Sequence, residues 1–93
     1  MVTPAAIPSL PRGVRLHHDR LRGAEVLLGP ERALMLDPVG AAVLAEVDGR
    51  RSVGAIAAVL ARRYDAPEDA IRADIAEFLG DLADRRLVDL DDG

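Results

Sequence analysis

Residues 26–38 read VLLGPERALMLDP and contain two short apolar segments on either side of a Gly-Pro turn. The second segment, residues 32–36, runs directly into Asp37-Pro38. Aspartate is a good helix N-cap because its carboxylate accepts a backbone N–H that has no partner in the first turn, and proline suits that turn because it has no N–H to lose. We therefore expect two strands and then, at once, a helix that ends near Asp48-Gly49, where glycine tolerates a positive φ.

The same reasoning extends to the rest of the chain. Alternation of apolar and polar residues predicts one more strand before this unit, and helical spacing of apolar residues predicts two more helices after it. The predicted strands are 14–19, 25–28 and 32–36, and the predicted helices are 38–47, Ser52 to Tyr64, and a third that begins at the capping box Asp65-x-x-Glu68 and ends near Arg85-Arg86. The short connections favour an antiparallel meander. The predicted fold class is α+β, a three-stranded antiparallel sheet with three helices.

The two ends of the chain lack these patterns. Residues 1–13 carry three prolines and no periodicity, so we expect a flexible, Pro-rich lead-in or linker there. Residues 87–90 predict a short extended tail, and residues 91–93 are expected to fray. The predicted recognition domain therefore spans residues 14–90.

Composition bounds the function. At 93 residues the chain is one domain, and the absence of cysteine excludes disulfides, zinc–cysteine sites and thiol catalysis. The sequence shows neither a signal peptide nor an apolar run long enough to span a bilayer, so we expect a cytoplasmic protein without a membrane partner. The balance of charge is +2 in residues 1–36 and −6 in residues 67–93. An acidic C-terminal part disfavours nucleic acid, because such binding depends on neutralising phosphates.

No group of residues predicts catalysis or a metal site. His17 and His18 are adjacent in a predicted strand and therefore point to opposite faces, which disfavours joint chelation. Carboxylates on the third helix, spaced like Asp74 and Glu77, are typical of a solvated helix face, and no nucleophile accompanies them. We expect no enzyme, no cofactor and no metal, and favour electrostatic docking as the role of these acids.

Two other functions stay open. The first two helices have helix-turn-helix proportions, which makes a winged-helix DNA-binding regulator the main alternative. The arginines at 50, 51, 62 and 63 favour it, whereas a pI of about 5.0 and a second helix without Asn, Gln or Lys disfavour it. A structural or dimerisation module that pairs through an exposed strand is the third possibility.

A peptide-binding groove is the interpretation that the residues favour most. If the strand at residues 32–36 lies at a sheet edge, an extended peptide can add to it as a further strand. The apolar stripe of the third helix would then form the opposite wall. Its members are Ile71, Ile75, Phe78, Leu79 and Leu82.

These residues resemble the pyrroloquinoline quinone (PQQ) biosynthesis protein D family (PqqD). The resemblance is carried by LLGPER at residues 27–32, by the Leu34-x-Leu36-Asp37 segment and Val47-Asp48-Gly49, and by Phe78-Leu79 before Leu87-Val88. It covers about residues 12–90. It implies a three-stranded sheet followed by a three-helix, winged-helix-like bundle. It also implies a peptide chaperone, a recognition element of ribosomally made, modified peptides (RiPPs).

The resemblance further implies the partners and the site. Members of the family bind the precursor peptide (PqqA) and present it to a radical S-adenosylmethionine (SAM) enzyme (PqqE), which cross-links a glutamate to a tyrosine in the peptide. We expect a monomer. Carried over by position, the peptide-binding residues are Arg32, Ala33, Leu34, Met35, Leu36, Ile71, Arg72, Asp74, Ile75, Phe78 and Leu79.

Overall fold

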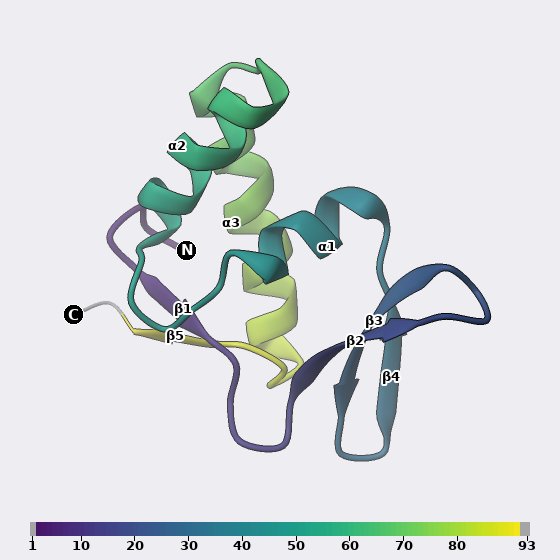
Figure 1. The fold of residues 1–93 in the computed structure, drawn as a ribbon. Coiled ribbons are helices and arrows are strands. Elements are labelled where there is room, and N and C mark those ends of the chain that lie inside the picture. Colours follow the sequence, from purple (N-terminus) through teal and green to yellow (C-terminus); the bar gives the residue numbers. More distant parts are fainter. Residues whose placement is uncertain (1, 92–93) are drawn as a thin grey trace.

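The computed structural model describes residues 2–91, which form three helices and two antiparallel sheets (Figure 1). The strands are β1 (Ile7–Ser9), β2 (Arg15–Asp19), β3 (Ala24–Gly29), β4 (Arg32–Met35) and β5 (Asp89–Asp91), and the helices are α1 (Pro38–Ala45), α2 (Val53–Tyr64) and α3 (Glu68–Asp84). The predicted α+β class is confirmed. The second sheet, formed by β1 and β5, was not predicted.

The three-stranded sheet is the predicted meander in the order β2–β3–β4. Leu27 of β3 lies opposite Leu34 of β4, and Val26 lies opposite Met35. The Gly-Pro turn joins β3 to β4, and Glu31 in this turn takes a positive φ of 59°. Within the described chain β4 therefore stands at an open edge of its sheet, next to the start of α1.

The N-terminal segment differs from the predicted flexible lead-in. Residues 7–9 pair with 89–91, and Ala6 is fully buried. The Val53 N–H donates to the Ala6 carbonyl at 2.8 Å, and the Gly54 N–H donates to the Pro4 carbonyl at 2.9 Å. The first N–H groups of a helix have no partner within the helix. The N-terminal segment satisfies two of them at the start of α2, which explains its fixed path. Asp91, expected to fray, lies in β5, whereas residues 92–93 lie outside the described residues.

The first helix ends earlier than predicted. α1 stops at Ala45, with Glu46 as its C-cap, and the Asp48 carboxylate turns into the following loop instead of closing the helix. There its Oδ1 accepts the N–H groups of Arg50 and Arg51, both at 2.9 Å. This side-chain turn competes with continued helix, a common role for aspartate. Gly49 supplies the positive φ of 77° that the loop needs.

The capping box predicted for the third helix does not form. Asp65 instead ends α2 in the left-handed region, with a φ of 50°, and its N–H donates back to the last turn of α2. Aspartate is among the residues that adopt this conformation most readily. Pro67 is the N-cap of α3 and has no side-chain cap bond. Glu68 and Asp69 then place negative charge in the first turn, where the helix dipole favours it.

The core is aliphatic and lies between the sheets and the helices. Its members share very low exposure and come from every helix, from β3 and from the loops flanking the strands. The fully buried large side chains include Leu27, Ile56, Leu79, Val53 and Val88. No polar side chain of the described residues is buried. None of the helices in this part of the chain is long and apolar enough to cross a membrane.

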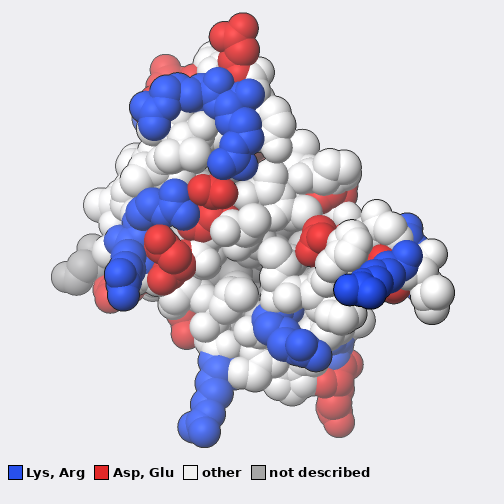
Figure 2. Space-filling model, viewed as in Figure 1, with Lys and Arg blue, Asp and Glu red and all other residues white. Residues whose placement is uncertain are grey.

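Glu46 links α1 to the loop before α2 and to the end of α2. Its two carboxylate oxygens accept hydrogen bonds from Arg51 Nη1 at 3.0 Å and from Arg63 Nη2 at 3.3 Å. The hydrogen bond from Arg51, aided by Arg63, holds the pKa of Glu46 below its ordinary value of 4.5, although partial burial opposes the shift. Figure 2 shows acidic side chains among the basic ones over α2 and the loop before it, in keeping with the ion pairs of Glu46 to Arg51 and Arg63.

We predict that the N-terminal segment contributes to global stability. Ala6→Glu places a charge at a fully buried position, whereas Ala5→Glu places the same charge at an exposed neighbour. We expect Ala6→Glu to lower the free energy of unfolding by about 3 kcal/mol or more, and Ala5→Glu to leave it within about 0.5 kcal/mol. Urea denaturation followed by circular dichroism measures both. Equal midpoints for the two variants would show that this segment does not belong to the fold.

We predict that Glu46→Gln lowers the urea midpoint at neutral pH and flattens its acid dependence. The folded-state pKa of Glu46 is depressed, so its ionised form adds stability above the ordinary carboxyl range, and this stability is lost as the pH falls through the folded-state pKa. The difference between the two proteins should therefore shrink at acid pH. A difference that stays constant from neutral pH to about pH 3 would contradict the assignment.

Candidate functional site

The first part of the site is the free edge of β4. The Leu36 N–H donates to the Glu25 carbonyl at 3.0 Å, so the backbone groups of Leu36 face β3. Backbone groups of successive residues point to opposite sides of a strand. The N–H and C=O groups of Ala33 and Met35 therefore point to the open edge, where a further strand can pair with them.

A shallow apolar groove runs beside this edge, between β4 and the C-terminal half of α3. Its volume is about 200 Å³. Leu34, Met35 and Leu36 line it from the strand side, and Phe78 and Leu82 line it from the helix. Asp81 and Arg85 stand at its rim and add one charge of each sign. The groove therefore has apolar walls for side chains of a peptide that pairs with β4. We call this the β4 groove.

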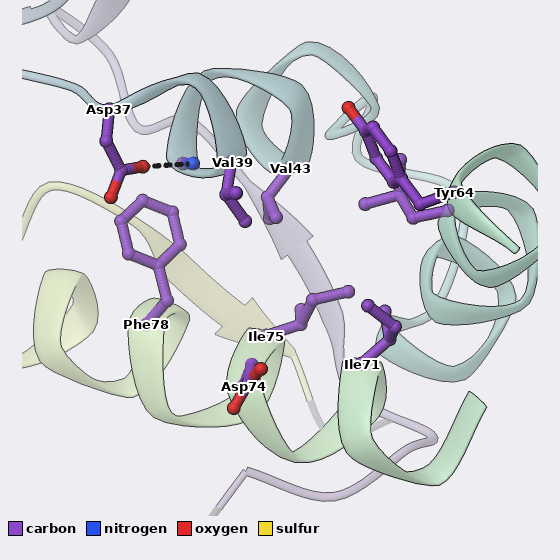
Figure 3. A pocket seen from close by; sticks show the side chains of 10 residues that line it. Asp37, Val39, Val43, Tyr64, Ile71, Asp74, Ile75 and Phe78 are labelled. Atoms are coloured by element: carbon purple, nitrogen blue, oxygen red, sulfur yellow. Dashed lines mark hydrogen bonds between the residues drawn. The ribbon is translucent and has the colours of Figure 1, made fainter. Parts of the chain in front are cut away.

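A larger hollow lies between α1, α2 and α3 and measures about 500 Å³ (Figure 3). Val39 and Val43 point into it from α1, and Ile71 and Ile75 point toward them from α3. Tyr64 of α2 stands at one end and Phe78 at the other. Leu60, Gly40, Asp37 and Asp74 complete the lining. We call this the interhelical hollow.

Two residues, Asp37 and Phe78, line both the β4 groove and the interhelical hollow. The Asp37 carboxylate accepts the Gly40 N–H at 2.7 Å, which caps α1 and holds its first turn beside the end of β4. A Cβ atom at Gly40 would stand 3.0 Å from Phe78 Cζ, so glycine lets the ring approach the helix backbone. The two depressions therefore form one continuous surface with the Phe78 ring between them.

Seven of the predicted site residues line one or both of the two depressions, and the others lie elsewhere. Leu34, Met35 and Leu36 line the β4 groove, Ile71, Asp74 and Ile75 line the interhelical hollow, and Phe78 lines both. Leu79 has no exposed surface and belongs to the core, because it lies on the inner side of the helical stripe. Arg72 lines neither depression. Its guanidinium bonds to Asp69 at 3.0 Å, on its own helix. Ala33 lines neither depression but offers its backbone at the edge.

Arg32 has a structural contact that the sequence did not indicate. Its Nη1 donates to the carbonyl of Arg85 at 2.8 Å, at the C-terminal end of α3. The last carbonyl groups of a helix have no partner within the helix and attract cations. Arg32 therefore connects the first residue of β4 to the end of α3, the two elements that flank the β4 groove.

Several lining residues were missed from the sequence. Asp81 and Arg85 follow Phe78 by three and seven positions and lie near its face of α3, beside Leu82, which the predicted apolar stripe already contained. Including the charged neighbours of this stripe would have found them. Val39 and Tyr64 come from other helices, and no periodicity within one helix reveals which helix ends meet. Tyr64, the last residue of the predicted second helix, is 52% exposed.

The remaining candidates lie away from this surface. His18 Nδ1 bonds to Glu25 Oε1 at 2.6 Å across β2 and β3. Among residues 2–91, no group of three or more histidine, aspartate or glutamate side chains is placed to hold a metal ion. The side chains that line the two depressions are mainly hydrocarbon, an arrangement suited to binding apolar side chains.

Comparison with known proteins gives a consistent result. A family model described as coenzyme PQQ synthesis protein D (PqqD) matches residues 25–88. The PqqA binding protein of Rhizobium meliloti (strain 1021) is 39% identical over 90 residues, which cover 97% of this chain and 92% of that protein.

Two solved structures share the fold. One is the NMR structure of the PqqD truncation of Methylobacterium extorquens PqqCD, described as a functional, stand-alone RiPP recognition element. It matches with a TM-score of 0.85 and 45% identity, and the match covers 96% of this chain and 95% of that one. The other is TbiB1 in complex with the TbiA(beta) leader peptide, with a TM-score of 0.75, 20% identity and coverage of 87% and 94%. At this identity the second match shows a common fold alone.

We predict that Arg32→Ala loosens the contact between β4 and α3. Loss of one hydrogen bond should lower the free energy of unfolding by about 0.5–1 kcal/mol. Amide hydrogen exchange in the last turn of α3 should also become faster. Arg15→Ala removes another exposed arginine, from β2, and should change neither quantity. Identical exchange rates in the two variants would mean that Arg32 does not hold this end of the helix.

Proposed function

Because the chain belongs to the coenzyme PQQ synthesis protein D (PqqD) family, we propose that it binds the ribosomally made precursor peptide (PqqA) of PQQ biosynthesis as a non-catalytic recognition element. The family that the sequence resembled is confirmed. The observation that carries the proposal is the open edge of β4 beside an apolar groove. A PqqA binding protein among the relatives and a leader peptide bound to a protein of the same fold support it.

The proposed mode of binding is strand addition. An extended peptide pairs with the outward N–H and C=O groups of Ala33 and Met35, and these main-chain bonds provide affinity for many sequences. Alternate side chains of the added strand face the β4 groove, because side chains in a strand alternate between its two faces. Leu34, Phe78 and Leu82 then favour apolar side chains at those positions. Main chain and groove together provide both affinity and specificity.

The finer partners are also part of the proposal. The domain presents the bound peptide to the radical SAM enzyme (PqqE) that cross-links glutamate to tyrosine, and it acts as a cytoplasmic monomer with no nucleic-acid or membrane partner. The enzyme docks on a charged surface away from the β4 edge, which the peptide occupies. The acidic side of α3 and the basic N-terminal half are the two candidates that the charge distribution offers.

The recognition domain was predicted over residues 14–90, with a winged-helix-like arrangement of helices and meander. We keep the winged-helix-like description as a proposal, supported by three consecutive helices beside a three-stranded sheet. We extend the proposed domain toward Val2, because β1 pairs with β5 and the segment before it bonds to the start of α2. Residues 2–13 then belong to the recognition element itself.

The DNA-binding alternative has less support. Two of the four arginines that favoured it, Arg51 and Arg63, are bonded to Glu46, so the positive charge of the predicted helix-turn-helix is partly compensated. Uncompensated cations are what phosphate binding requires. The basic side chains seen over α2 in Figure 2 thus lie beside an acidic centre.

We predict that Ala33→Pro weakens binding of the unmodified precursor peptide roughly tenfold, the loss expected for about 1.4 kcal/mol of main-chain hydrogen bonding. Proline removes the N–H that points to the open edge, and it is tolerated at such edge positions. Isothermal titration calorimetry measures the affinity. NMR titration of the wild-type protein should shift the signals of residues 32–36 and 78–85, and Ala33→Pro should reduce these shifts at equal peptide concentration.

Ala33→Val is the matched control, because it keeps the N–H group and adds only a side chain that strands favour. Its affinity should stay within about twofold of the wild-type value, well under the 1.4 kcal/mol of a tenfold change. Folding of both variants is checked by their NMR spectra. Full affinity in a folded Ala33→Pro protein would exclude strand addition at β4.

A further inference from the structure

Exposed apolar side chains gather along one path on this protein. Four large hydrophobic residues of the described chain are exposed, namely Leu21, Met35, Val39 and Tyr64. Met35 lines the β4 groove, and Val39 and Tyr64 line the interhelical hollow. Single exposed apolar residues need no explanation, but three along one continuous depression indicate a surface that a ligand covers.

The depth and volume of the interhelical hollow suit it to hold a side chain of a bound peptide. Its floor is buried, with Val43 at 2% and Ile75 at 3% exposure, whereas Val39 on its rim is 62% exposed. Its volume of about 500 Å³ falls within the roughly 300–1,000 Å³ range of small-ligand pockets. Figure 3 shows the valines of α1 facing the isoleucines of α3 across this space. A large apolar side chain is thus the ligand group that fits the walls.

The rim of the hollow is acidic. Its lining holds two carboxylates, Asp37 and Asp74, and no arginine or lysine. The nearest cation on the same helix, Arg72, bonds to Asp69 and lies within 3.9 Å of Glu68, so it does not neutralise this rim. Negative charge beside low-dielectric walls attracts a cation more strongly than the same charge in open solvent.

The hollow continues from the proposed peptide path. Asp37 and Phe78 line both depressions, so a peptide that leaves the end of β4 near Met35 passes directly over the Phe78 ring. Backbone pairing alone reads little sequence, because any residue but proline supplies the same main-chain groups. A second contact of defined chemistry, next to the edge, adds to the selectivity that the β4 groove provides.

We propose that the interhelical hollow is an anchor site for the same peptide, which takes one large apolar side chain adjoined by a lysine or arginine. This inference rests on the proposed function. The apolar side chain enters between Val39, Ile71 and Tyr64. The neighbouring cation stands against Asp74 and Asp37 at the rim. Recognition then joins main-chain pairing at β4 to one apolar and one basic residue of the peptide.

The test reverses the charge of the rim. Asp74→Arg changes an exposed residue of the hollow, and Glu77→Arg makes the same change at an exposed residue of α3 that lines neither the hollow nor the β4 groove. The probe is the unmodified precursor peptide, with a set of variants in which each basic residue is changed in turn to glutamate. We expect Asp74→Arg to weaken binding roughly tenfold and Glu77→Arg to change it less than about twofold. One glutamate variant of the peptide should regain affinity for Asp74→Arg.

A second substitution tests the apolar part. Val39→Glu places a charge on the exposed rim, near the start of α1, where negative charge suits the helix and folding is preserved. We expect this variant also to lose roughly tenfold in affinity. In the wild-type titration, methyl signals of Val39, Val43 and Ile71 should shift together with those of Leu34 and Leu36.

The outcomes separate the anchor site from strand addition. Wild-type affinity in folded Asp74→Arg and Val39→Glu proteins, with binding weakened in Ala33→Pro, overturns the anchor site and keeps strand addition. NMR shifts limited to residues 32–36 and 78–85 overturn the anchor site as well. Rescue by a single glutamate peptide supports it. A precursor peptide that fails to bind the folded wild-type protein overturns the anchor site and the proposed function together.

Discussion

The site depends on the hydrogen bond between the Asp37 carboxylate and the Gly40 N–H. This bond of 2.7 Å ends β4 and begins α1 within three residues, so the edge strand and the helix cannot move apart. Because Gly40 has no Cβ atom, the Phe78 ring packs closely against the backbone of α1; a Cβ atom there would stand 3.0 Å from Phe78 Cζ. The position of α3 relative to β4 is thus fixed from one side by this capped turn. Arg32 fixes it from the other through the carbonyl of Arg85.

Local rules predicted much of the fold. The strands of the meander, the three helices and the N-caps Asp37 and Ser52 follow from periodicity and from side-chain oxygens at helix starts. The start of α3 did not, because Asp65 suits both an N-cap and a left-handed C-cap and takes the second role here, which leaves Pro67 as the N-cap of α3. Strand β1 was not predicted from the sequence either. Its partner β5 is about eighty residues away in the chain, and Pro8 within the strand, with Pro4 before it and Pro11 after it, conceals any alternation.

The sequence predicted the site residues that lie along one strand or one helix, and it did not predict those that other helices contribute. Leu34, Leu36 and Phe78 share one groove because a strand edge and a helix stripe were each readable from the sequence. The same stripe placed Leu79 in the groove, although a rotation of 100° about the helix axis moves it into the core. Val39 and Tyr64 line one hollow because α1, α2 and α3 together surround it, and the packing of the helices depends on the whole core.

The pairing of the first strand with the last has a mechanical meaning. In β1 and β5 the register joins Ile7 to Asp91 at one end of the seam and Ser9 to Asp89 at the other. A pull on both ends of the domain first loads the bonds of Pro4 and Ala6 to the first turn of α2, because these residues precede β1 in the chain. It then reaches the pair of Ile7 and Asp91, so the seam opens one residue pair at a time instead of resisting in shear. Tension transmitted through a neighbouring domain would thus loosen the helical half first and leave the meander with its open edge intact.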